Sequence, residues 1–499
     1  INWLTDKLWI KAVISEFLEI KSKKILFSSH HYSHAASAFF CSPYKNSAIL
    51  TVDGVGEWVT TTLGVGKSDW DGAGKNEIKL FEEIRFPHSL GLLYSVFTAF
   101  LGFKVNNGEY KVMGMSSYGE PKYVDRIYKL IKVNSDGSFK LNMKYFSYHY
   151  STRYSFNNNF VKLFGEPRNP DSDFMVESNN ISQDYGKCRD LEKNESKRFT
   201  DIAASIQKVT EDVLIKMANY LYEKTGLSNL CMAGGVALNC VANYKILKQT
   251  PFEKIFIQPA AGDNGAALGA ALYVWHCLFE KQRKFVLNHC SWGKSYDSRD
   301  IREFLDKKGI NYKEFYNKEE LLDYVVEALI NQKVIGWFQG RFEWGPRALG
   351  NRSIIADPRN PGMQDIINEK IKFRELFRPF APSVLEEYAK EFFELDDSQQ
   401  LAFKFMLITV PVKQRNLMPA VTHVDGTSRI QLVSQKDNSC YYNLIKKFYN
   451  RTKIPMVLNT SFNLKGEPIV NSPCDAYNSF KKSGMDLCVL ENFVIEKSN

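Results

Sequence analysis

Apolar and polar positions in the first half of the chain predict strands that alternate with helices. The apolar run AILTVD (48–53), a Gly-rich turn and the run VTTTLGVG predict a β-hairpin. Helical periodicity marks residues 89–103 and the long amphipathic stretch 199–226, for which Thr200 or Asp201 is the predicted start. Such alternation is typical of an α/β domain.

Runs on either side of these elements continue the alternation. NLCMAGG (229–235) and KIFIQP (254–259) predict strands, and GAALGAALYVWHCLF predicts a helix after them. Near the start of the chain, residues 1–20 predict an amphipathic helix and ILFSS (25–29) predicts a short strand. We therefore expect an α/β fold from the first residues onward.

A polar segment and a loop divide the chain. Residues 134–195 are rich in Asn, Ser, Tyr and Asp and poorly periodic, which predicts an insertion or lid. The loop-like stretch SWGKSYDSRD predicts a boundary between a first domain, 1–288, and a second domain, 289–499. In the second domain the strands VIGWF, FMLITVPV and MVLNT alternate with helices predicted at 318–331, 385–394 and 441–450.

Composition narrows the class of protein. The 499 residues carry 65 basic and 56 acidic side chains, a net charge of +9, and the basic residues are dispersed. This mild excess would suit anionic small molecules as well as nucleic acid, and the absence of a continuous basic stripe argues against a nucleic-acid partner. No stretch approaches about 18 apolar residues, so no membrane span is expected. Nine cysteines without a C-x-x-C pair indicate reduced thiols in a cytoplasmic protein.

Three of the eight histidines lie within HHYSHAASAFF, at the start of an apolar run. On a helix, His30 and His34 project from one face, while His31 points elsewhere. Asp53 ends a predicted strand, where α/β sheets present functional groups. Two imidazoles and a carboxylate suit a first-row divalent ion, although a helix-start His pair that only caps or packs is the alternative.

Two glycine turns indicate a nucleotide site. MAGGVALN (232–239) places two glycines between a strand and a helix, where backbone amides can approach an anion. AAGDNGAALGAAL (260–272) repeats the arrangement and carries Asp263. Facing one cleft, the two turns would form a site for adenosine and a metal; the alternative is two ordinary turns with an Asp cap.

Basic side chains gather in the second domain between prolines and glycines, an arrangement that is not typical of a solvated helix face. Guanidinium groups bind phosphate or carboxylate in bidentate fashion, so a pocket for phosphate-bearing ligands is predicted. The rival interpretation is an RNA-binding surface with stacked aromatics. The residues concerned are Arg347, Arg352, Lys370, Lys372, Arg374, Arg378 and Arg429, with Ser461 and Asn463 at a strand end.

Eight motifs together resemble the O-carbamoyltransferases of the nodulation and antibiotic-biosynthesis type, over nearly the whole chain. They are HHYSHAASAFF, LTVDGVGEW, NNGEYKVMGMSSYGEP, MAGGVALNCVAN, PAAGDNGAALGAA, RFEWGPRALGNRSIIADPR, KFRELFRPFAPSV and LNTSFNLKGEPIV. The resemblance implies a TsaD-like domain of the actin, heat-shock-chaperone and sugar-kinase fold, followed by a YrdC-like α/β domain. It also implies that the second domain makes carbamoyl-adenylate from carbamoyl phosphate and ATP, and that the first transfers the carbamoyl group to an acceptor hydroxyl.

The same resemblance implies roles for individual residues. As ligands of Fe²⁺ or another first-row divalent ion it implies His30, His34, Asp53 and Asp263. As contacts to the adenylate it implies Gly234, Gly235 and Asn239. For carbamoyl phosphate and ATP with Mg²⁺ it implies Arg429, Ser461 and Asn463, with Arg347, Lys372 and Arg378 in catalysis.

One departure from the family pattern concerns the start of the chain. Family members open with a strand and a His-Asp-Ser-type loop, and this chain starts past that point. We expect that either a sizeable N-terminal segment is absent from this sequence, or the protein is truncated and its transfer site is impaired. Relatives that modify tRNA with threonylcarbamoyl-adenosine give one alternative function, and a kinase of the sugar-kinase fold gives another. The acceptor alcohol, its general base and the oligomeric state stay open.

Overall fold

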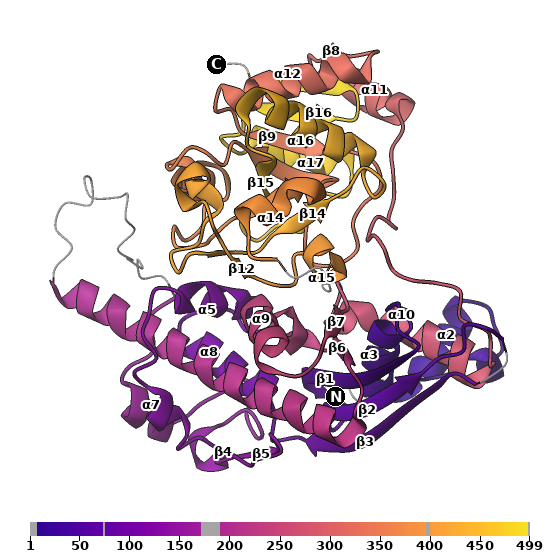
Figure 1. The fold of residues 1–499 in the computed structure, drawn as a ribbon, viewed down its shortest axis with the longest axis vertical. Helices are drawn as coiled ribbons and strands as arrows, with labels where there is room; N and C mark the ends of the chain where they lie inside the picture. Colours follow the sequence, from indigo (N-terminus) through magenta and orange to yellow (C-terminus); the bar gives the residue numbers. More distant parts are fainter. Residues whose placement is uncertain (1–6, 73–74, 171–189, 396–399, 498–499) are drawn as a thin grey trace.

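Two β-sheets, formed by the two halves of the chain, organise the protein (Figure 1). In this computed structural model the described residues are 7–72, 75–170, 190–395 and 400–497. The mixed α/β class predicted from the sequence is confirmed. No helix in these ranges is both long and apolar enough to cross a membrane.

The first sheet has the order β3-β2-β1-β6-β7. Its strands are β1 (Asn46–Gly56), β2 (Val59–Lys67), β3 (Glu77–Arg85), β6 (Asn229–Ala233) and β7 (Lys254–Ile257). The predicted hairpin is confirmed, because β1 and β2 are antiparallel with Asn46 opposite Lys67. β6 and β7 then add in parallel beside β1.

Alternation along β1 gives this sheet two buried faces. Ile49 packs into the apolar cluster under one group of helices, whereas Leu50 and Val52 face the larger cluster on the other side. Period-two alternation of β-strand side chains produces this division. Helices α3 (His30–Phe39) and α10 (Asp263–Tyr273) lie on one face of the sheet. The other helices of this half are α4 (Leu90–Phe100), α5 (Glu109–Ser116), α8 (Asp190–Thr225) and α9 (Cys240–Gln249).

The predicted insertion at 134–195 contributes aromatic side chains to the core. Phe160 and Phe164 of α7 (Asn158–Phe164) are buried against Phe97 and Phe100 of α4, with ring centroids 5.1–6.2 Å apart. The pair β4 (Ile131–Val133) and β5 (Phe139–Leu141) precedes α7. Residues 171–189 of the insertion lie outside the described part.

The second sheet has the order β14-β11-β15-β10-β9-β16-β17-β8. Its strands are β8 (Lys313–Glu314), β9 (Ile335–Phe338), β10 (Arg352–Ala356), β11 (Ala381–Leu385), β14 (Gln431–Val433), β15 (Met456–Ser461), β16 (Leu487–Leu490) and β17 (Phe493–Glu496). α16 packs on β11 and β15, α17 on β9 and β16, and α12 on α16. These helices are α12 (Lys318–Ile330), α16 (Ser439–Thr452) and α17 (Pro473–Lys481), with α11 (Ser298–Lys307) beside α17.

Short helices and one small strand pair complete the described elements. The strands are β12 (Val410–Pro411) and β13 (Thr427–Ser428). The helices are α2 (Ile10–Phe17), α6 (Val124–Ile127), α13 (Met363–Ile366), α14 (Ala389–Phe392) and α15 (Gln400–Lys404). Of the amphipathic helix predicted at 1–20, α2 and a preceding 3-10 turn at 7–9 form, and residues 18–20 are not helical; residues 1–6 lie outside the described part.

Several predicted boundaries are wrong. ILFSS forms no strand, because it pairs with no neighbour in the described sheets and Leu26 and Phe27 are exposed. The long helix begins at Asp190, well before Thr200, since the charged stretch ahead of it continues the helix. Asp201 instead accepts a hydrogen bond from the backbone N–H of Glu120 at 2.8 Å.

The run FMLITVPV is also not a full strand, because within it only β12 and an isolated bridge of Val412 to Phe393 are paired. The backbone just before β12 turns toward the first half of the chain. There the carbonyl of Leu407 accepts a hydrogen bond from the side chain of Asn243 at 2.9 Å. The backbone N–H of Thr409 donates to the carbonyl of Cys240 at 3.3 Å. The helix predicted at 385–394 is shorter as well, because β11 occupies its start and only the short turn 386–388 and α14 are helical.

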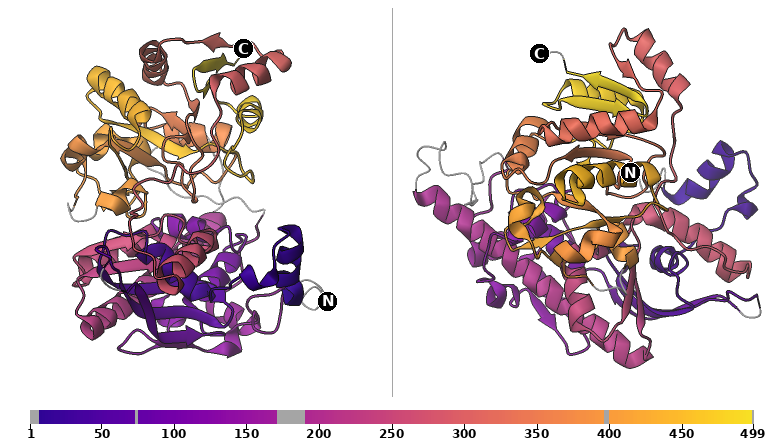
Figure 2. Two further views of the ribbon diagram at one scale, coloured as in Figure 1. Left: turned by 90° about the vertical axis from the view of Figure 1, so that its right-hand side faces the viewer. Right: turned by 45° about the horizontal axis from the view of Figure 1, so that its top comes forward.

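The second half of the chain lies against the first half, as Figure 1 and the left view of Figure 2 show. Helices α5 and α9 lie on the side of the first half that faces the second. The hydrogen bonds of Asn243 and Cys240 to the 407–409 segment cross this boundary. The boundary is therefore the place where residues of the two halves can share a site.

Candidate functional site

Helix α3 presents two histidines side by side. His30 is its first residue and His34 lies one turn later, and their Nε2 atoms are 2.9 Å apart. His31 points away, because its Nδ1 lies 2.6 Å from the hydroxyl of Thr51 and its Nε2 lies 2.9 Å from the carbonyl of Val59. Burial lowers the pKa of His31 to about 4, so this ring is neutral near pH 7.

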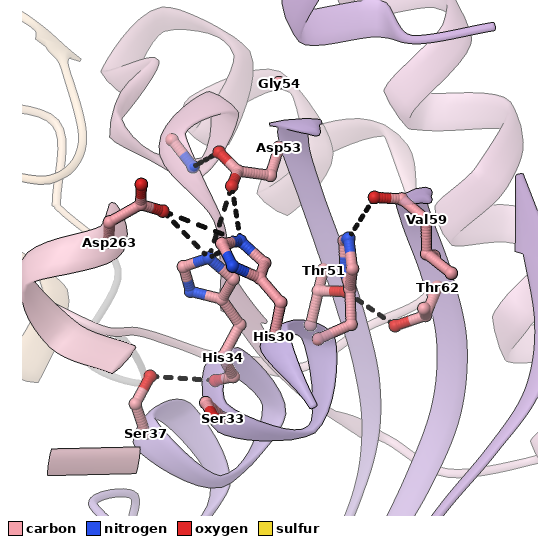
Figure 3. A network of polar contacts seen from close by, with 12 residues as sticks. His30, Ser33, His34, Ser37, Thr51, Asp53, Gly54, Val59, Thr62 and Asp263 are labelled. Carbon is pink, nitrogen blue, oxygen red and sulfur yellow. Dashed lines mark hydrogen bonds and ion pairs between the residues drawn. The ribbon is translucent and has the colours of Figure 1, made fainter. Parts of the chain in front are cut away.

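Two aspartates from other elements close on this histidine pair (Figure 3). Asp53 of β1 places Oδ2 2.8 Å from Nε2 of His30 and 3.3 Å from Nε2 of His34. Asp263, the first residue of α10, places Oδ1 3.5 and 3.6 Å from the same two nitrogens. One ligand atom from each of the four side chains lies within 4.8 Å of the others.

Helix α10 packs closely against helix α3 at Gly269. A Cβ at Gly269 would lie 1.8 Å from the carbonyl oxygen of Ser33, so a larger residue would force the helices apart. Gly56 is equally constrained, because a Cβ there would lie 2.1 Å from the ring of His30. Both glycines let the elements that carry the four side chains approach closely.

The four side chains fit a divalent ion. Ligand bonds of about 2.0–2.2 Å to His and Asp place neighbouring ligand atoms about 3–3.5 Å apart around one ion. The observed separations among His30, His34, Asp53 and Asp263 range from 2.8 to 3.6 Å for the pairs that include a histidine nitrogen. Nitrogen and carboxylate oxygen donors together suit first-row metals.

Charge within the cluster favours an ionised aspartate. Burial by itself would raise the pKa of Asp53, but hydrogen bonds with His30 and His34 and from the N–H of Gly235 lower it well below its usual range. Burial would lower the pKa of His34, but its contacts with Asp263 and Asp53 raise it. Nδ1 of His34 is buried without a hydrogen-bond partner in the described residues.

The turn between β6 and α9 lies directly beside this cluster. Gly234 has φ +93° and its missing Cβ would lie 2.2 Å from the carbonyl of Val52, so only glycine fits. Gly235 donates its N–H to Oδ1 of Asp53 at 2.8 Å. Asn239 caps α9 through Ala242 and exchanges amide hydrogen bonds with Gln207. The turn thus orients Asp53, and a nucleotide contact there stays a prediction.

A second group of predicted residues meets around Lys372 in the second half. Its buried ammonium donates to the backbone carbonyl and hydroxyl of Ser461, and to the backbone and side-chain carbonyls of Asn463 at 2.9 and 2.8 Å. Burial, and then the charges of Arg374 and Arg378, hold the pKa of Lys372 well below its usual range.

Arginines extend this positive cluster. Burial and then Arg429 lower the pKa of Arg347 to about 9, and burial and then Arg378 lower that of Arg374. Nε of Arg347 and Nε of Arg429 are buried without a hydrogen-bond partner among the described residues. Uncompensated buried cations are unfavourable in the free protein, and an anionic ligand would relieve that cost.

The two groups approach each other near Cys240, the first residue of α9. Arg347 interacts electrostatically with Cys240, which follows the Gly234–Asn239 turn. A Cβ at Gly345 would lie 3.3 Å from the carbonyl of Pro259, ahead of the turn that carries Asp263. The loop with Arg347 therefore lies against both turns of the first half.

Sequence reasoning missed some residues of this region. Tyr110 of α5 holds its ring 4.7 Å from the guanidinium of Arg378, and Lys111 pairs with Glu375 at 2.8 Å. Their motif, NNGEYKVMGMSSYGEP, was recognised, but no local pattern indicates a partner more than 250 residues away. Burial lowers the pKa of His423, which stands alone in the sequence, to about 4, and this residue lies close to Arg429.

Comparison with known protein families shows the family to which this chain belongs. The family model for the carbamoyltransferase N-terminus matches residues 2–272, and the model for the carbamoyltransferase C-terminus matches residues 326–497. The chain belongs to the carbamoyltransferase family. The resemblance inferred from the motifs is confirmed, and the protein is a carbamoyltransferase enzyme.

Relatives of this carbamoyltransferase align over most of its length. The uncharacterized protein sll1178 of Synechocystis sp. is 45% identical, covering 99% of this chain and 81% of the relative. Nodulation protein NolNO of Sinorhizobium fredii is 37% identical, covering 99% of this chain and 67% of the relative. Nodulation protein NolO of Bradyrhizobium diazoefficiens is 35% identical, covering 94% and 79% respectively.

Proposed function

We propose that this carbamoyltransferase makes carbamoyl-adenylate from carbamoyl phosphate and ATP and transfers the carbamoyl group to a hydroxyl of a saccharide or natural-product acceptor. The observation that carries the proposal is the cluster of poorly compensated cations beside the glycine turns of the first half. The two carbamoyltransferase family models support transfer of a carbamoyl group, and the hydroxyl acceptor is what the motif resemblance implies. Parallel strands beside a β-hairpin in the first sheet are consistent with an actin-like, TsaD-type fold, and we infer a YrdC-like fold for the second half.

The first half-reaction brings two multiply charged anions together. Lys372, Arg347 and Arg378 would bind the phosphates of carbamoyl phosphate and ATP and offset their repulsion, which is electrostatic and positional catalysis. A bond forms between a carbamate oxygen and the α-phosphorus of ATP while pyrophosphate leaves. The phosphoryl group of carbamoyl phosphate leaves as phosphate, so one water is consumed.

In this reaction Ser461 and Asn463 hold the ammonium of Lys372 in one place, because all three contact one another. Arg429 lies beside Arg347, and its charge adds to the same field. Magnesium would accompany ATP as its usual counter-ion. A pocket fixed in advance does not have to reorganise as charge moves from carbamoyl phosphate to the leaving groups.

The second half-reaction is placed at the His30, His34, Asp53 and Asp263 cluster. An iron-type divalent ion held there would supply Lewis-acid polarisation of a bound carbonyl or phosphate oxygen. Gly234, Gly235 and Asn239 line the neighbouring turn, where an adenylate would approach the backbone. The acceptor hydroxyl attacks the carbamoyl carbon, its proton passes to a base, and AMP leaves. Burial between the two halves keeps water from the adenylate.

One paired experiment tests this division of labour. Wild-type enzyme should release pyrophosphate from ATP only when carbamoyl phosphate is present. Arg378→Ala should lose this release, whereas His34→Ala should keep it and fail to carbamoylate an acceptor alcohol, as measured by mass spectrometry. ATP turnover without carbamoyl phosphate would instead indicate a kinase, and equal loss of both half-reactions in His34→Ala would contradict two separate sites.

A further inference from the structure

The loop of residues 372–378, hereafter the anion loop, carries two of the cations proposed to bind phosphate, Lys372 and Arg378, with Arg374 between them. It has no regular helix or strand, so its shape depends on side-chain contacts. Within its own half, Asn368 braces it by accepting from Nε of Arg374 at 2.7 Å and donating to the carbonyl of Arg378 at 3.0 Å. Gln364 also donates to the carbonyls of Leu376 and Arg378, and Lys372 is bound to Ser461 and Asn463. Further contacts come from the first half of the chain.

An ion pair crosses from α5 to the anion loop. Nζ of Lys111 lies 2.8 Å from Oε1 of Glu375, and the two side chains are only 17% and 19% exposed. Oε2 of the same Glu375 lies 3.6 Å from Arg378. Because the pair is largely withdrawn from water, it is screened less than a surface ion pair and restrains both partners more strongly.

Tyr110, the neighbour of Lys111, supports the guanidinium of Arg378 directly. The guanidinium lies over its ring at 4.7 Å, within the range of a cation–π contact. Tyr110 also lies near Arg347 and Arg374. One aromatic side chain of the first half thus lies among three arginines of the second half.

The C-terminal end of the anion loop, at Phe377, also contacts the first half of the chain. The hydroxyl of Tyr118 donates to the carbonyl of Phe377 at 3.3 Å, and the ring of Phe377 is buried near Tyr118 and Phe103. Phe103, Lys111 and Tyr118 all belong to the first half. The loop is therefore held at its middle by an ion pair and near its end by an aromatic contact.

Helix α5 is itself fixed firmly enough to act as a support. Glu109, its first residue, accepts hydrogen bonds from the hydroxyl of Ser95 at 2.8 Å and from the backbone N–H groups of Asn106 and Gly108 at 2.9 and 3.1 Å. Ser95 belongs to α4, which packs on β1. The position of Tyr110 and Lys111 is consequently set by the core of the first half.

We propose that Tyr110 and Lys111 are positioning residues for the anion loop, so that the ATP- and carbamoyl-phosphate-dependent chemistry of the second half requires α5 of the first half. This inference rests on the proposed function. Tyr110 holds the guanidinium of Arg378 through its ring, and Lys111 holds the backbone of the loop through Glu375. Neither residue needs to touch the reacting atoms.

The test measures carbamoyl-phosphate-dependent pyrophosphate release by the full-length chain. Tyr110→Leu removes the aromatic face, and the KM for carbamoyl phosphate should rise about tenfold, the size expected for a partly desolvated cation–π contact. Tyr110→Phe keeps the ring and should stay within about twofold of wild type. Lys111→Gln should raise the same KM several-fold. The thermal unfolding midpoint of each variant is measured in parallel.

Lys122→Gln is the matched control. Lys122 pairs with Glu120 at 3.0 Å, is 57% exposed, and contacts only residues of the first half among the described pairs, so its loss should leave the KM unchanged. Wild-type KM values in Tyr110→Leu and Lys111→Gln would overturn the inference, as would equal losses in Tyr110→Leu and Tyr110→Phe. So would a loss explained by unfolding alone, with unchanged KM in the folded fraction.

The outcome for the wild type separates the two proposals. If wild-type enzyme releases no pyrophosphate with both substrates present, the proposed function fails and this inference fails with it. If wild-type enzyme is active and the α5 variants match it, only the role of α5 is wrong.

Discussion

At the scale of single residues, the second half concentrates positive charge where water has little access. Arg347 illustrates the cost: its pKa is lowered to about 9 by burial and by Arg429, and its Nε has no hydrogen-bond partner among the described residues. Arg347 is half-buried, and a cation there without a counter-ion disfavours the free protein; under the proposed function an anionic ligand supplies the missing charge. Removing Arg347 should therefore leave the stability of the free protein unchanged or raise it, and should weaken the binding of anions.

The variant Arg347→Met tests that trade-off. We expect the ligand-free free energy of unfolding to stay unchanged or to rise by up to about 1 kcal/mol, because an unpaired, half-buried charge is replaced by an apolar chain. Pyrophosphate at 100 times its Kd should stabilise the wild type by about 2.7 kcal/mol and should no longer stabilise the variant. Urea unfolding with and without pyrophosphate measures both effects.

Arg451→Met serves as the comparison for this variant, because Arg451 is 58% exposed and pairs with Glu327 at the surface. It should keep the stabilisation by pyrophosphate. A ligand-free Arg347→Met enzyme that is less stable than wild type by about 2 kcal/mol or more, as in ordinary core truncation, would contradict the explanation.

At the scale of elements, the histidine and aspartate cluster depends on how closely two helices pack. His30 and His34 follow from one helical turn of α3, but Asp263 reaches them only because α10 lies against α3 at Gly269. A helix interior normally favours Ala over Gly by about 1 kcal/mol. At Gly269 that preference is outweighed, since a Cβ would overlap the carbonyl of Ser33.

Gly269→Ala should therefore destabilise the protein by about 1–3 kcal/mol, the usual cost of overpacking, in spite of its better helix propensity. It should also weaken binding of a divalent ion, because α10 must move and take Asp263 with it. Denaturant unfolding and metal titration measure the two effects.

Gly262→Ala, at the start of the same helix, is the control, since its Cβ would lie at an ordinary 3.5 Å from Oδ1 of Asn264. Its stability should change by less than about 0.5 kcal/mol. A Gly269→Ala protein as stable as wild type, with unaltered metal affinity, would show that the two helices adjust freely.

At the scale of the whole molecule, the two halves are joined by hydrogen bonds of buried groups. Asn243 of α9 is fully buried and donates from Nδ2 to the carbonyl of Ala237 at 2.8 Å and to the carbonyl of Leu407 at 2.9 Å. One amide thus fixes both the end of the glycine turn and the segment that arrives from the second half. Removing it leaves two buried carbonyls with one partner fewer.

Asn243→Ala should lower the free energy of unfolding by about 1–3 kcal/mol, the range for a buried polar group that loses its partner. Equilibrium unfolding in urea measures the change. Asn478→Ala removes an exposed amide from α17 and should be nearly neutral. Equal effects of the two substitutions would mean that the contact between the halves adds little to stability.

The sequence by itself determined the α/β class, the hairpin of β1 and β2, the common face of His30 and His34, and membership of the carbamoyltransferase family. These features depend on hydrophobic periodicity, residue spacing and short motifs, all of which are read within one stretch of sequence. The tertiary structure decided where helix α8 begins, that ILFSS forms no strand, and that Gly235 holds Asp53. It alone brought Tyr110 and Lys111 of α5 to the anion loop, because contacts between residues more than 250 positions apart leave no periodic trace in either segment.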